Sequence, residues 1–320
     1  MNTTLEPPCS NSADPSAQVA FKLRQFLQSV LFGKEHQIDM VIGCLLARGH
    51  LLLDDLPGTG KTTLAKAISE AVNGRLARVQ CTPDLMPSDI TGFSMFNQKT
   101  REFDFHPGPV FADVLLADEL NRTTPRTQSA LLEAMGERQV TIEGKTHPLS
   151  PTFMVIATQN PIDSHGAYPL PEAQLDRFAI KLRIGYPDRD AQKQILSRAT
   201  QAESASLPEM SPLSLDQLRQ TQDHVRTIQV HSRVSDYLID LVEATRNDAA
   251  VELGVSARGM LHWQSIAQAW AMLQGRDFVT PSDIAIVAQP VLSVRLLTRG
   301  EDVDVVIDRM MNTVAAPEYK

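Results

Sequence analysis

The sequence predicts an α/β fold in which a parallel sheet carries helices on both faces and a small all-α domain follows. Three observations support this prediction. A short apolar strand at 51–53 runs through a Pro/Gly turn into a helix. Apolar strands then alternate with helical patterns as far as residue 184, and beyond Arg189 only helical patterns remain. Such alternation is typical of a parallel sheet that is covered on both faces.

The elements of the α/β part follow from the spacing of apolar residues. Helices are expected at 19–30, 35–47, 62–72, 84–90 and 127–135. Sheet strands are expected at 51–53, 77–81, 110–117, 153–158 and 178–184. Two hairpins are expected from alternating residues, at 93–96 with 102–105 and at 139–142 with 147–149.

The first hairpin contains five large apolar residues: Phe93, Met95, Phe96, Phe103 and Phe105. An alternating apolar face usually packs on the core, so burial of one face is the main expectation. A surface that grips a partner is the alternative, because aromatic and Met side chains are enriched at contact sites. On the second hairpin, Lys145 and His147 are expected to be solvated rather than to touch a polymer.

Changes in composition divide the chain into segments. We expect a flexible polar tail at 1–18, the α/β domain at 19–188, a connecting helix and linker at 189–213, a helical lid at 214–312 and a C-terminal tail at 313–320. The Ser- and Pro-rich stretch 201–213 is the linker. Helices after the sheet are expected at 190–200, 214–228, 232–248, 256–274 and 282–293.

Composition limits the kind of protein. The chain has 320 residues, 42% hydrophobic and 21% charged, as in soluble globular proteins. No apolar run approaches the roughly 20 residues of a membrane span, and the start of the chain lacks an apolar signal core, so we expect a cytoplasmic protein without membrane insertion. Cys9, Cys44 and Cys81 lack metal or redox spacing. The net charge of −8 disfavours general nucleic-acid binding.

A phosphate-binding loop follows the first strand. Its candidate contacts are Pro57, Gly58, Thr59, Gly60, Lys61, Thr62 and Thr63. The loop's N–H groups and the following helix N-terminus offer donors to a polyphosphate. Lys61 can reach the β- and γ-phosphates, and the Thr62 hydroxyl can ligate Mg²⁺. Asp55 stands where the pattern GxxxxGK[ST] has glycine, and we expect it to face away from the phosphates because contact between negative groups is costly.

Two adjacent carboxylates end the 110–117 strand. Ligands bind at the C-terminal edge of α/β sheets, so Asp118 is placed to hold Mg²⁺ and Glu119 to polarise a water for attack on the γ-phosphate. An Asp-Glu pair after a strand is usually a solvated loop end. Downstream of a phosphate loop it becomes a strong catalytic signal.

Three further residues are candidates for the chemistry. Asn160, at the end of the 153–158 strand, can orient the attacking water, although Asn before Pro is also common in turns. Arg177 could pair with a surface carboxylate or, in a ring, reach a neighbour's γ-phosphate. Arg258 opens a lid helix against the helix dipole, which a phosphate partner would explain.

With these motifs in place, residues 19–310 resemble the MoxR family of AAA+ ATPases. The matching segments are 51–63 (Walker A), 114–119 (Walker B), 158–161 (sensor 1), 175–178 (arginine finger) and 254–259 (sensor 2). Longer and more diagnostic similarity lies in the runs 81–92 and 121–135. The resemblance implies an AAA+ P-loop NTPase core with two hairpin inserts and a helical lid, ATP and Mg²⁺ as ligands, and an adenine pocket near residues 31–34, including Gly33.

The resemblance also implies an ATPase that works as a ring, most simply a homo-hexamer, with Arg177 supplied by the neighbouring subunit. It implies chaperone-like work on client proteins, with a von Willebrand factor A domain protein as a candidate partner. A nucleic-acid motor related to helicases is the alternative, which the acidic charge and the lack of an appended DNA-binding domain disfavour. A nucleotide-dependent scaffold with negligible turnover is a third, which Glu119 and Arg177 argue against.

Overall fold

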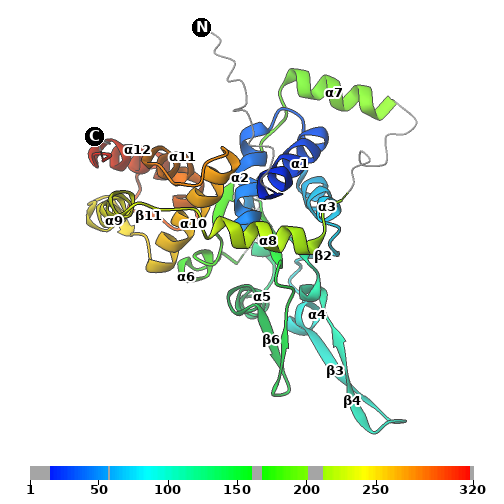
Figure 1. Cartoon of the computed structure of the whole chain (residues 1–320). Helices are drawn as coiled ribbons and strands as arrows, with labels where there is room; N and C mark the ends of the chain where they lie inside the picture. The colour runs from blue at the N-terminus through cyan, green and yellow to red at the C-terminus, as the bar shows by residue number, and fades with distance from the viewer. Residues whose placement is uncertain (1–14, 57, 161–167, 201–211, 318–320) are drawn as a thin grey trace.

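The computed structural model describes residues 15–56, 58–160, 168–200 and 212–317. Its centre is a parallel sheet in the order β2-β5-β8-β1-β9, five strands within the described residues (Figure 1). The strands are β1 (Leu51–Asp54), β2 (Leu76–Gln80), β5 (Val114–Asp118), β8 (Met154–Gln159) and β9 (Ile180–Leu182). The predicted α/β class with a following lid is confirmed.

Helices cover both faces of the sheet because the strands are apolar on both sides. Leu51 and Leu53 of β1 belong to one core cluster, and Leu52 between them belongs to the other. The first cluster packs under three helices: α1 (Pro15–Val30), α2 (Glu35–Leu46) and α3 (Lys61–Ala71). The second packs under α5 (Pro125–Glu137). Burial on both faces is what parallel strands require.

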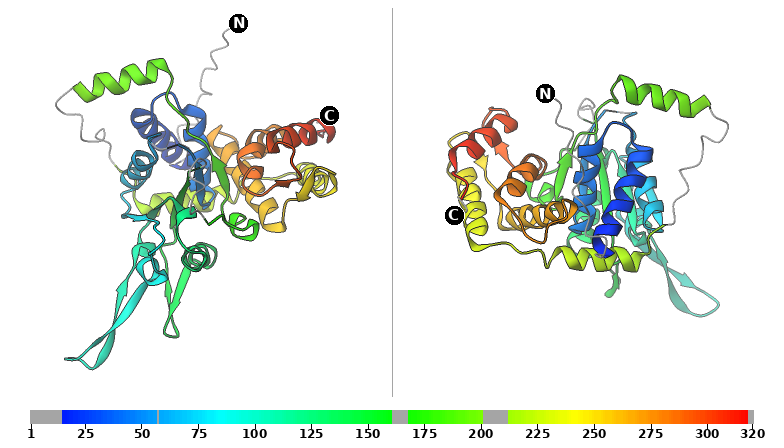
Figure 2. Two further views of the ribbon diagram at one scale, coloured as in Figure 1. Left: turned by 180° about the vertical axis from the view of Figure 1, so that it is seen from behind. Right: turned by 45° about the horizontal axis from the view of Figure 1, so that its top comes forward.

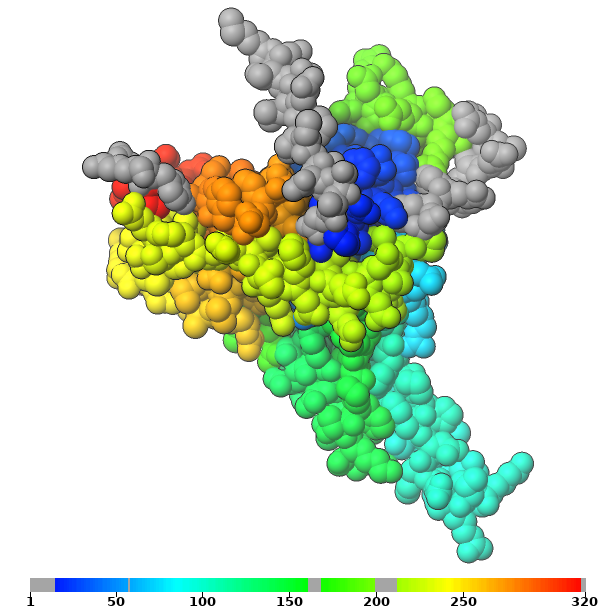
Figure 3. Space-filling model, in the orientation of Figure 1, coloured from blue at the N-terminus to red at the C-terminus, as the bar shows by residue number. Residues whose placement is uncertain are grey.

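Two hairpins project together from one end of the molecule (Figures 1 and 3). One joins β3 (Gly92–Asn97) to β4 (Glu102–Pro107), and the other joins β6 (Gln139–Ile142) to β7 (Lys145–Pro148). The short helix α4 (Pro87–Thr91) leads into the first hairpin, and the 3-10 turns η1 (Pro109–Phe111) and η2 (Leu120–Arg122) flank β5.

Burial of one face of the first hairpin, the main expectation, is wrong. Four of its five large apolar side chains are at least half exposed: Phe93, Met95, Phe96 and Phe103. The hairpin extends away from the sheet, so Phe93, Phe96 and Phe103 meet only rings of the hairpin itself among the aromatic contacts of the described residues, whereas Phe105, near its base, contacts rings outside it. The Phe105 ring stacks on His147 of the second hairpin with centroids 4.1 Å apart. His147, expected to be solvated, is therefore partly covered.

Within the described residues, the chain after the sheet is mainly helical, with one two-stranded ladder and an isolated bridge between Gln229 and Phe278. The helices are α7 (Arg189–Thr200), α8 (Leu215–Val225), α9 (Ser232–Asn247), α10 (Ala257–Leu273), α11 (Pro281–Leu292) and α12 (Val303–Thr313). The ladder joins β10 (Val251–Leu253) to β11 (Leu297–Thr298). Helices α9 to α12 form the lid beside the sheet domain (Figure 2). Helix α7 lies away from the lid and contacts α1, where Arg198 Nη1 donates to the Ser29 carbonyl at 2.8 Å. Helix α8 packs on α1 and α2, and one apolar cluster runs through α2 and α10, so lid and sheet domain share a core.

Several predicted boundaries shift for physical reasons. Helix α1 begins at Pro15, inside the expected tail, and Ser16 is buried with the helix. The strand expected from residue 110 begins at Val114, because η1 with its Pro109 precedes it. Helix α12 was not expected, and it is capped by the Asp302 side chain. The proposed division into domains stays a prediction.

Some predictions fall outside the described residues. They are those on Pro57, on Pro161 of the 158–161 segment, on residues 1–14 of the N-terminal tail with Cys9, on most of the 201–213 linker and on residues 318–320. Cys44 and Cys81 are both buried and free, as expected of structural thiols. Within the described ranges, no helix combines the length and apolar character needed to cross a membrane.

Candidate functional site

The phosphate loop connects β1 to α3. Gly58 and Gly60 have φ angles of +84° and +92°, a left-handed conformation that favours glycine. Lys61, the first residue of α3, folds its side chain back over the loop, where Nζ donates to the carbonyl of Asp55 at 2.8 Å. Thr59 is buried and donates to the Leu56 carbonyl at 3.2 Å. The loop is therefore closed on itself, with the lysine ammonium held across it.

Asp55 points away from the loop interior. Its buried carboxylate accepts hydrogen bonds from the backbone N–H groups of Ile184 and Gly185, the latter at 3.1 Å. These N–H groups follow β9, the neighbour of β1 in the sheet. The aspartate thus joins the start of the loop to the end of the adjacent strand, and the geometry agrees with the expectation that it avoids the phosphates.

The segment expected to hold adenine lies beside the loop. A Cβ on Gly60 would stand 3.6 Å from Leu31 Cδ2, so the two positions are in contact distance. Gly33 has a φ of +64°, and a Cβ there would lie 3.3 Å from the Cβ of Ala191 in α7. Lys34 Nζ donates to the carbonyl of Tyr186 at 2.9 Å. The 31–34 segment is therefore fixed between the phosphate loop and the start of α7.

The two carboxylates at the end of β5 are joined by one hydroxyl from β8. The fully buried Thr158 donates to Asp118 Oδ1 at 2.7 Å and accepts from the backbone N–H of Glu119 at 2.8 Å. Glu119 adopts φ 58°, a left-handed conformation rare for residues other than glycine. Such conformations persist where the surroundings enforce them, often at functional sites.

Sequence reasoning missed the residues that hold these carboxylates. On β2, Arg78 pairs with Asp118 Oδ2 at 2.8 Å, and Gln80 donates to Glu119 Oε2 at 3.0 Å. Arg122 donates to the same glutamate oxygen at 3.2 Å. Polar residues alternate with apolar ones along β2 and could have signalled a polar face. The pairing of β2 with β5 that brings them to the carboxylates is a long-range contact.

The predicted residue Asn160 and the buried Cys81 also lie near this edge of the sheet. Asn160 directly follows β8 and is half buried. The preceding Gln159 accepts a hydrogen bond from Asp55 N at 3.3 Å, which ties the end of β8 to the phosphate loop. Cys81 lies next to the carboxylates, and burial with the negative charges of Asp118 and Glu119 raises the pKa of its thiol to about 12, so the thiol stays protonated.

Arg177 and Arg258 are not brought to the phosphate loop of their own chain. Arg177 precedes β9, whereas the loop follows β1, and these two strands run parallel. The arginine therefore lies at the opposite edge of the sheet. Arg258, in the first turn of α10, belongs to the same region because Ser256 Oγ donates to Asp176 Oδ2 at 2.7 Å. Figure 1 shows α6 (Glu172–Leu175), which leads into Arg177, beside α10.

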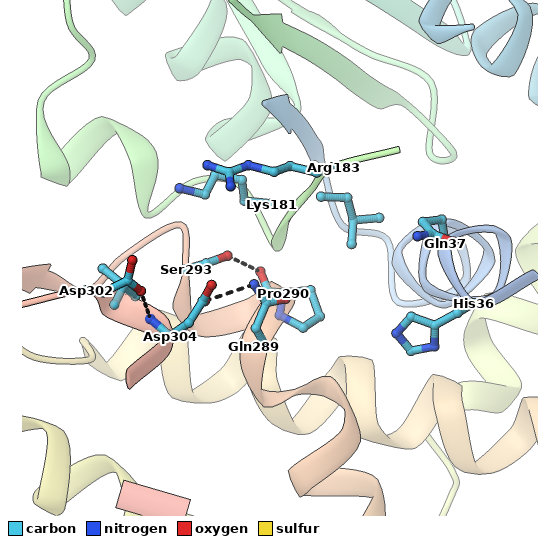
Figure 4. Close-up of a pocket in the computed structure, with 11 residues that line it drawn as sticks. His36, Gln37, Lys181, Arg183, Gln289, Pro290, Ser293, Asp302 and Asp304 are labelled. Atoms are coloured by element: carbon cyan, nitrogen blue, oxygen red, sulfur yellow. Dashed lines mark hydrogen bonds between the residues drawn. The ribbon is translucent and has the colours of Figure 1, made fainter. Parts of the chain in front are cut away.

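A cavity of about 320 Å³ lies between the sheet domain and part of the lid (Figure 4). His36 and Gln37, in the first turn of α2, form one end of it. Lys181 and Arg183 of the β9 segment face the acidic start of α12 across it. Burial lowers the pKa of Lys181. The junction of sheet domain and lid is thus hollow beside the start of α2.

Comparison with known proteins agrees with this geometry. Residues 50–180 match the model of the ATPase family associated with various cellular activities, and residues 243–310 match the AAA lid domain. A crystal structure from Cytophaga hutchinsonii, described as a candidate ATPase, superposes with a TM-score of 0.87 at 30% identity and covers 96% of this chain and 98% of its own.

Curated relatives cover nearly the whole chain. YeaC of Bacillus subtilis, described as uncharacterized, is 40% identical over 92% of this chain and 94% of its own. Chaperone MoxR1 of Mycobacterium tuberculosis is 38% identical over 91% and 81%. Protein MoxR of Paracoccus denitrificans is 30% identical over 91% and 94%. None of these matches favours a nucleic-acid motor. The chain therefore belongs to the MoxR family of AAA+ ATPases.

Proposed function

We propose that this chain hydrolyses ATP to ADP and phosphate within a homo-hexameric ring in the cytoplasm, and uses that hydrolysis to remodel or assemble partner proteins. The observation that carries the proposal is the separation of two groups of residues. Lys61 and Glu119 lie at the C-terminal edge of the sheet, whereas Arg177 and Arg258 lie at the opposite edge. β1 has four residues, which span roughly 13 Å at about 3.3 Å each.

This separation means that one subunit cannot complete its own site. Arg177 and Arg258 can meet a nucleotide only if another copy presents its phosphate loop to that face. Such a contact joins unlike surfaces, and head-to-tail contacts of this kind close into rings. An arginine supplied to the γ-phosphate from a neighbour accelerates hydrolysis by roughly 10³–10⁵ in well-studied systems.

Each residue at the C-terminal edge has a role in this proposal. Lys61 and the loop N–H groups bind the phosphates. Thr62 and Asp118 offer the hydroxyl and carboxylate oxygens that Mg²⁺ prefers, and the ion neutralises phosphate charge when bound. Glu119, whose carboxylate Gln80 and Arg122 hold, accepts the proton of the attacking water, and Asn160 orients that water.

The β3–β4 hairpin is the proposed contact with client proteins. Its exposed Phe93 and Met95 lie on one face of the hairpin and Phe96 and Phe103 on the other, and surfaces rich in aromatic and Met side chains suit protein contacts. Chaperone work is supported by the relative named Chaperone MoxR1. A von Willebrand factor A domain protein is the candidate client. The free, buried thiols of Cys44 and Cys81 suit a reducing cytoplasm.

Phosphate release measured over a range of protein concentrations tests the enzyme proposal. Specific activity should rise with concentration as rings assemble, and Glu119→Gln should abolish release while leaving ATP binding intact. Equal phosphate release from Glu119→Gln and the unchanged protein would contradict hydrolysis at this site. The client proposal is tested by expressing Glu119→Gln in cells and identifying the proteins that co-purify with ATP. Recovery of nucleic acid alone would overturn it.

A further inference from the structure

A buried arginine of the lid holds the chain on both sides of Arg177. Arg295 lies just after α11 and is only 5% exposed. Its Nη2 donates to the carbonyl of Phe178 at 2.6 Å, and its Nη1 donates to the carbonyl of Ala179 at 3.2 Å. Its Nε pairs with Asp176 Oδ1 at 3.2 Å. One guanidinium thus fixes the residue before Arg177 and the two residues after it.

The second oxygen of Asp176 reaches another lid element. Asp176 Oδ2 accepts from Ser256 Oγ at 2.7 Å, and Ser256 Oγ also accepts from the backbone N–H of Gly259 at 2.9 Å, which caps α10. Arg258 is in this same first turn. The carboxylate of Asp176 is therefore shared between the end of α11 and the start of α10, and it ties the segment carrying Arg177 to the helix carrying Arg258.

Neighbouring residues leave room for this arrangement. A Cβ on Gly259 would stand 2.7 Å from Arg295 Cδ and 2.9 Å from its Nε, so glycine lets the guanidinium pass close to α10. Burial and the charge of Arg295 lower the pKa of His262 to about 4, so the imidazole stays neutral and adds no positive charge. A buried charge is costly unless it is paired and hydrogen-bonded. Arg295 therefore requires the full set of partners that surrounds it.

The tip of Arg177 is held less firmly than its backbone. Its Nη1 is buried without a hydrogen-bond partner among the described residues. This nitrogen rests on Gly136 of α5, where an added Cβ would lie 1.8 Å away. The backbone on either side is fixed by Arg295, while the tip of the side chain packs on α5. Because Nη1 makes no hydrogen bond there, the side chain can turn from α5 toward a phosphate of another subunit without breaking one.

We propose that Asp176 and Arg295 are positioning residues that fix Arg177 to the lid, so that a movement of one subunit's lid also moves the arginine that serves the next subunit's ATP. This inference rests on the proposed function, in which Arg177 acts on a neighbour. If the pair instead only stabilised its own subunit, breaking it would impair every activity of that subunit, including catalysis at its own phosphate loop.

Mixing experiments distinguish an effect on the neighbouring subunit from an effect on the variant's own subunit. The test variants are Asp176→Asn and Arg295→Met, and the partner is Glu119→Gln, which cannot hydrolyse ATP but carries an intact Arg177. Each test variant alone should release phosphate about 10²-fold more slowly, since misplacing a catalytic group by about 1 Å has an effect of that size. Mixed in equal amounts with Glu119→Gln, each should recover at least about tenfold, because its own Lys61 and Glu119 remain intact.

Two controls make the result decisive. Arg177→Ala mixed with Glu119→Gln reports whether the arginine acts on a neighbour at all. Arg309→Met breaks the lid ion pair of Arg309 with Asp248 and Glu301, away from Arg177, and should leave phosphate release within about twofold of the unchanged protein. The affinity for a fluorescent ADP analogue should also stay within twofold in Asp176→Asn, since ADP binds at the variant's own loop.

The outcomes are distinct. Recovery of both Asp176→Asn and Arg295→Met on mixing supports the inference. Recovery of the Arg177→Ala control without recovery of the test variants overturns it and leaves the proposed function standing. Failure of the control itself removes the neighbour-acting role of Arg177, and the inference falls with it. If Arg295→Met does not fold, Asp176→Asn and Ser256→Ala decide the question in the same assay.

Discussion

The hydroxyl of Thr158 donates to Asp118 Oδ1 at 2.7 Å and in return fixes the backbone N–H of Glu119 at 2.8 Å. This single group from β8 therefore orients both carboxylates at the end of β5. It also provides the only hydrogen bond that we find for the N–H of a residue held at φ 58°, within the described part of the chain. Side chains that hold catalytic groups in position often affect activity as much as the catalytic groups themselves.

Replacing Thr158 by Val keeps the shape and removes both hydrogen bonds. We expect the free energy of unfolding to fall by about 1 kcal/mol, because two hydrogen bonds of the fully buried Thr158 hydroxyl are lost. We expect phosphate release to fall about 10–100-fold as Glu119 loses its alignment. Thr158→Ser restores the hydroxyl and should recover most of the rate. Equal rates for the Val and Ser variants would show that the hydroxyl does not orient Glu119.

Replacing Asp55 by Gly restores the usual phosphate-loop pattern yet should harm the protein. The carboxylate that accepts from the N–H groups of Ile184 and Gly185 is lost, and we expect the free energy of unfolding to fall by about 1–3 kcal/mol. Asp55→Asn keeps one carbonyl acceptor and should lose less. Urea unfolding, with and without ADP, measures the loss of unfolding free energy in both variants. A Gly variant as stable as the unchanged protein would contradict this role for the carboxylate.

The two kinds of apolar residue in the first hairpin should respond differently to substitution. Met95 is 55% exposed, so Met95→Ser should change the free energy of opening of the hairpin by less than about 0.5 kcal/mol. Phe105→Ser removes the stack on His147 and should destabilise the hairpin by about 1 kcal/mol. Hydrogen exchange of the hairpin amides measures both. Similar effects of the two changes would mean that the contact between the hairpins adds no stability.

Stability should fall as the solution is acidified below neutral pH. Burial and the charge of Arg138 lower the pKa of His50 to about 3, whereas an unfolded His titrates near 6.5. Between these values the unfolded chain binds a proton that the folded chain does not. The stabilisation is therefore complete above about pH 6.5 and is lost as pH falls toward 3, by up to about 1.4 kcal/mol per pH unit.

Urea unfolding at pH 7, 6 and 5 measures this slope. His50 is fully enclosed, with its two ring nitrogens engaged by Met135 O and Val155 N. His50→Gln offers a neutral donor and acceptor in its place and should make the slope shallower. The lowered pKa of His262 contributes in the same direction, so a smaller slope should remain in the variant. An unchanged slope would show that His50 does not contribute.

The sequence by itself determined whatever depends on residues close together in the chain. The glycines of the phosphate loop, Lys61 and the Asp118-Glu119 pair are recognisable because strand, loop and side chain form one continuous segment. Short apolar runs predicted the sheet strands, and alternation of apolar residues predicted both hairpins, for the same reason. The resemblance of the longer runs to the MoxR family then agreed with the comparisons over nearly the whole chain.

Only the tertiary structure decided which segments distant in the sequence come into contact. Arg78 reaches Asp118 because β2 pairs with β5, and no local pattern fixes that strand order. Arg295 meets Asp176 across 119 residues of sequence. The exposed state of Met95 and its neighbours arises because their hairpin extends beyond the sheet, although the same alternation would serve a buried face. The spacing of residues in the sequence specifies which faces of a helix or strand are apolar. Contacts between elements distant in the sequence determine which residues those faces and the charged side chains meet.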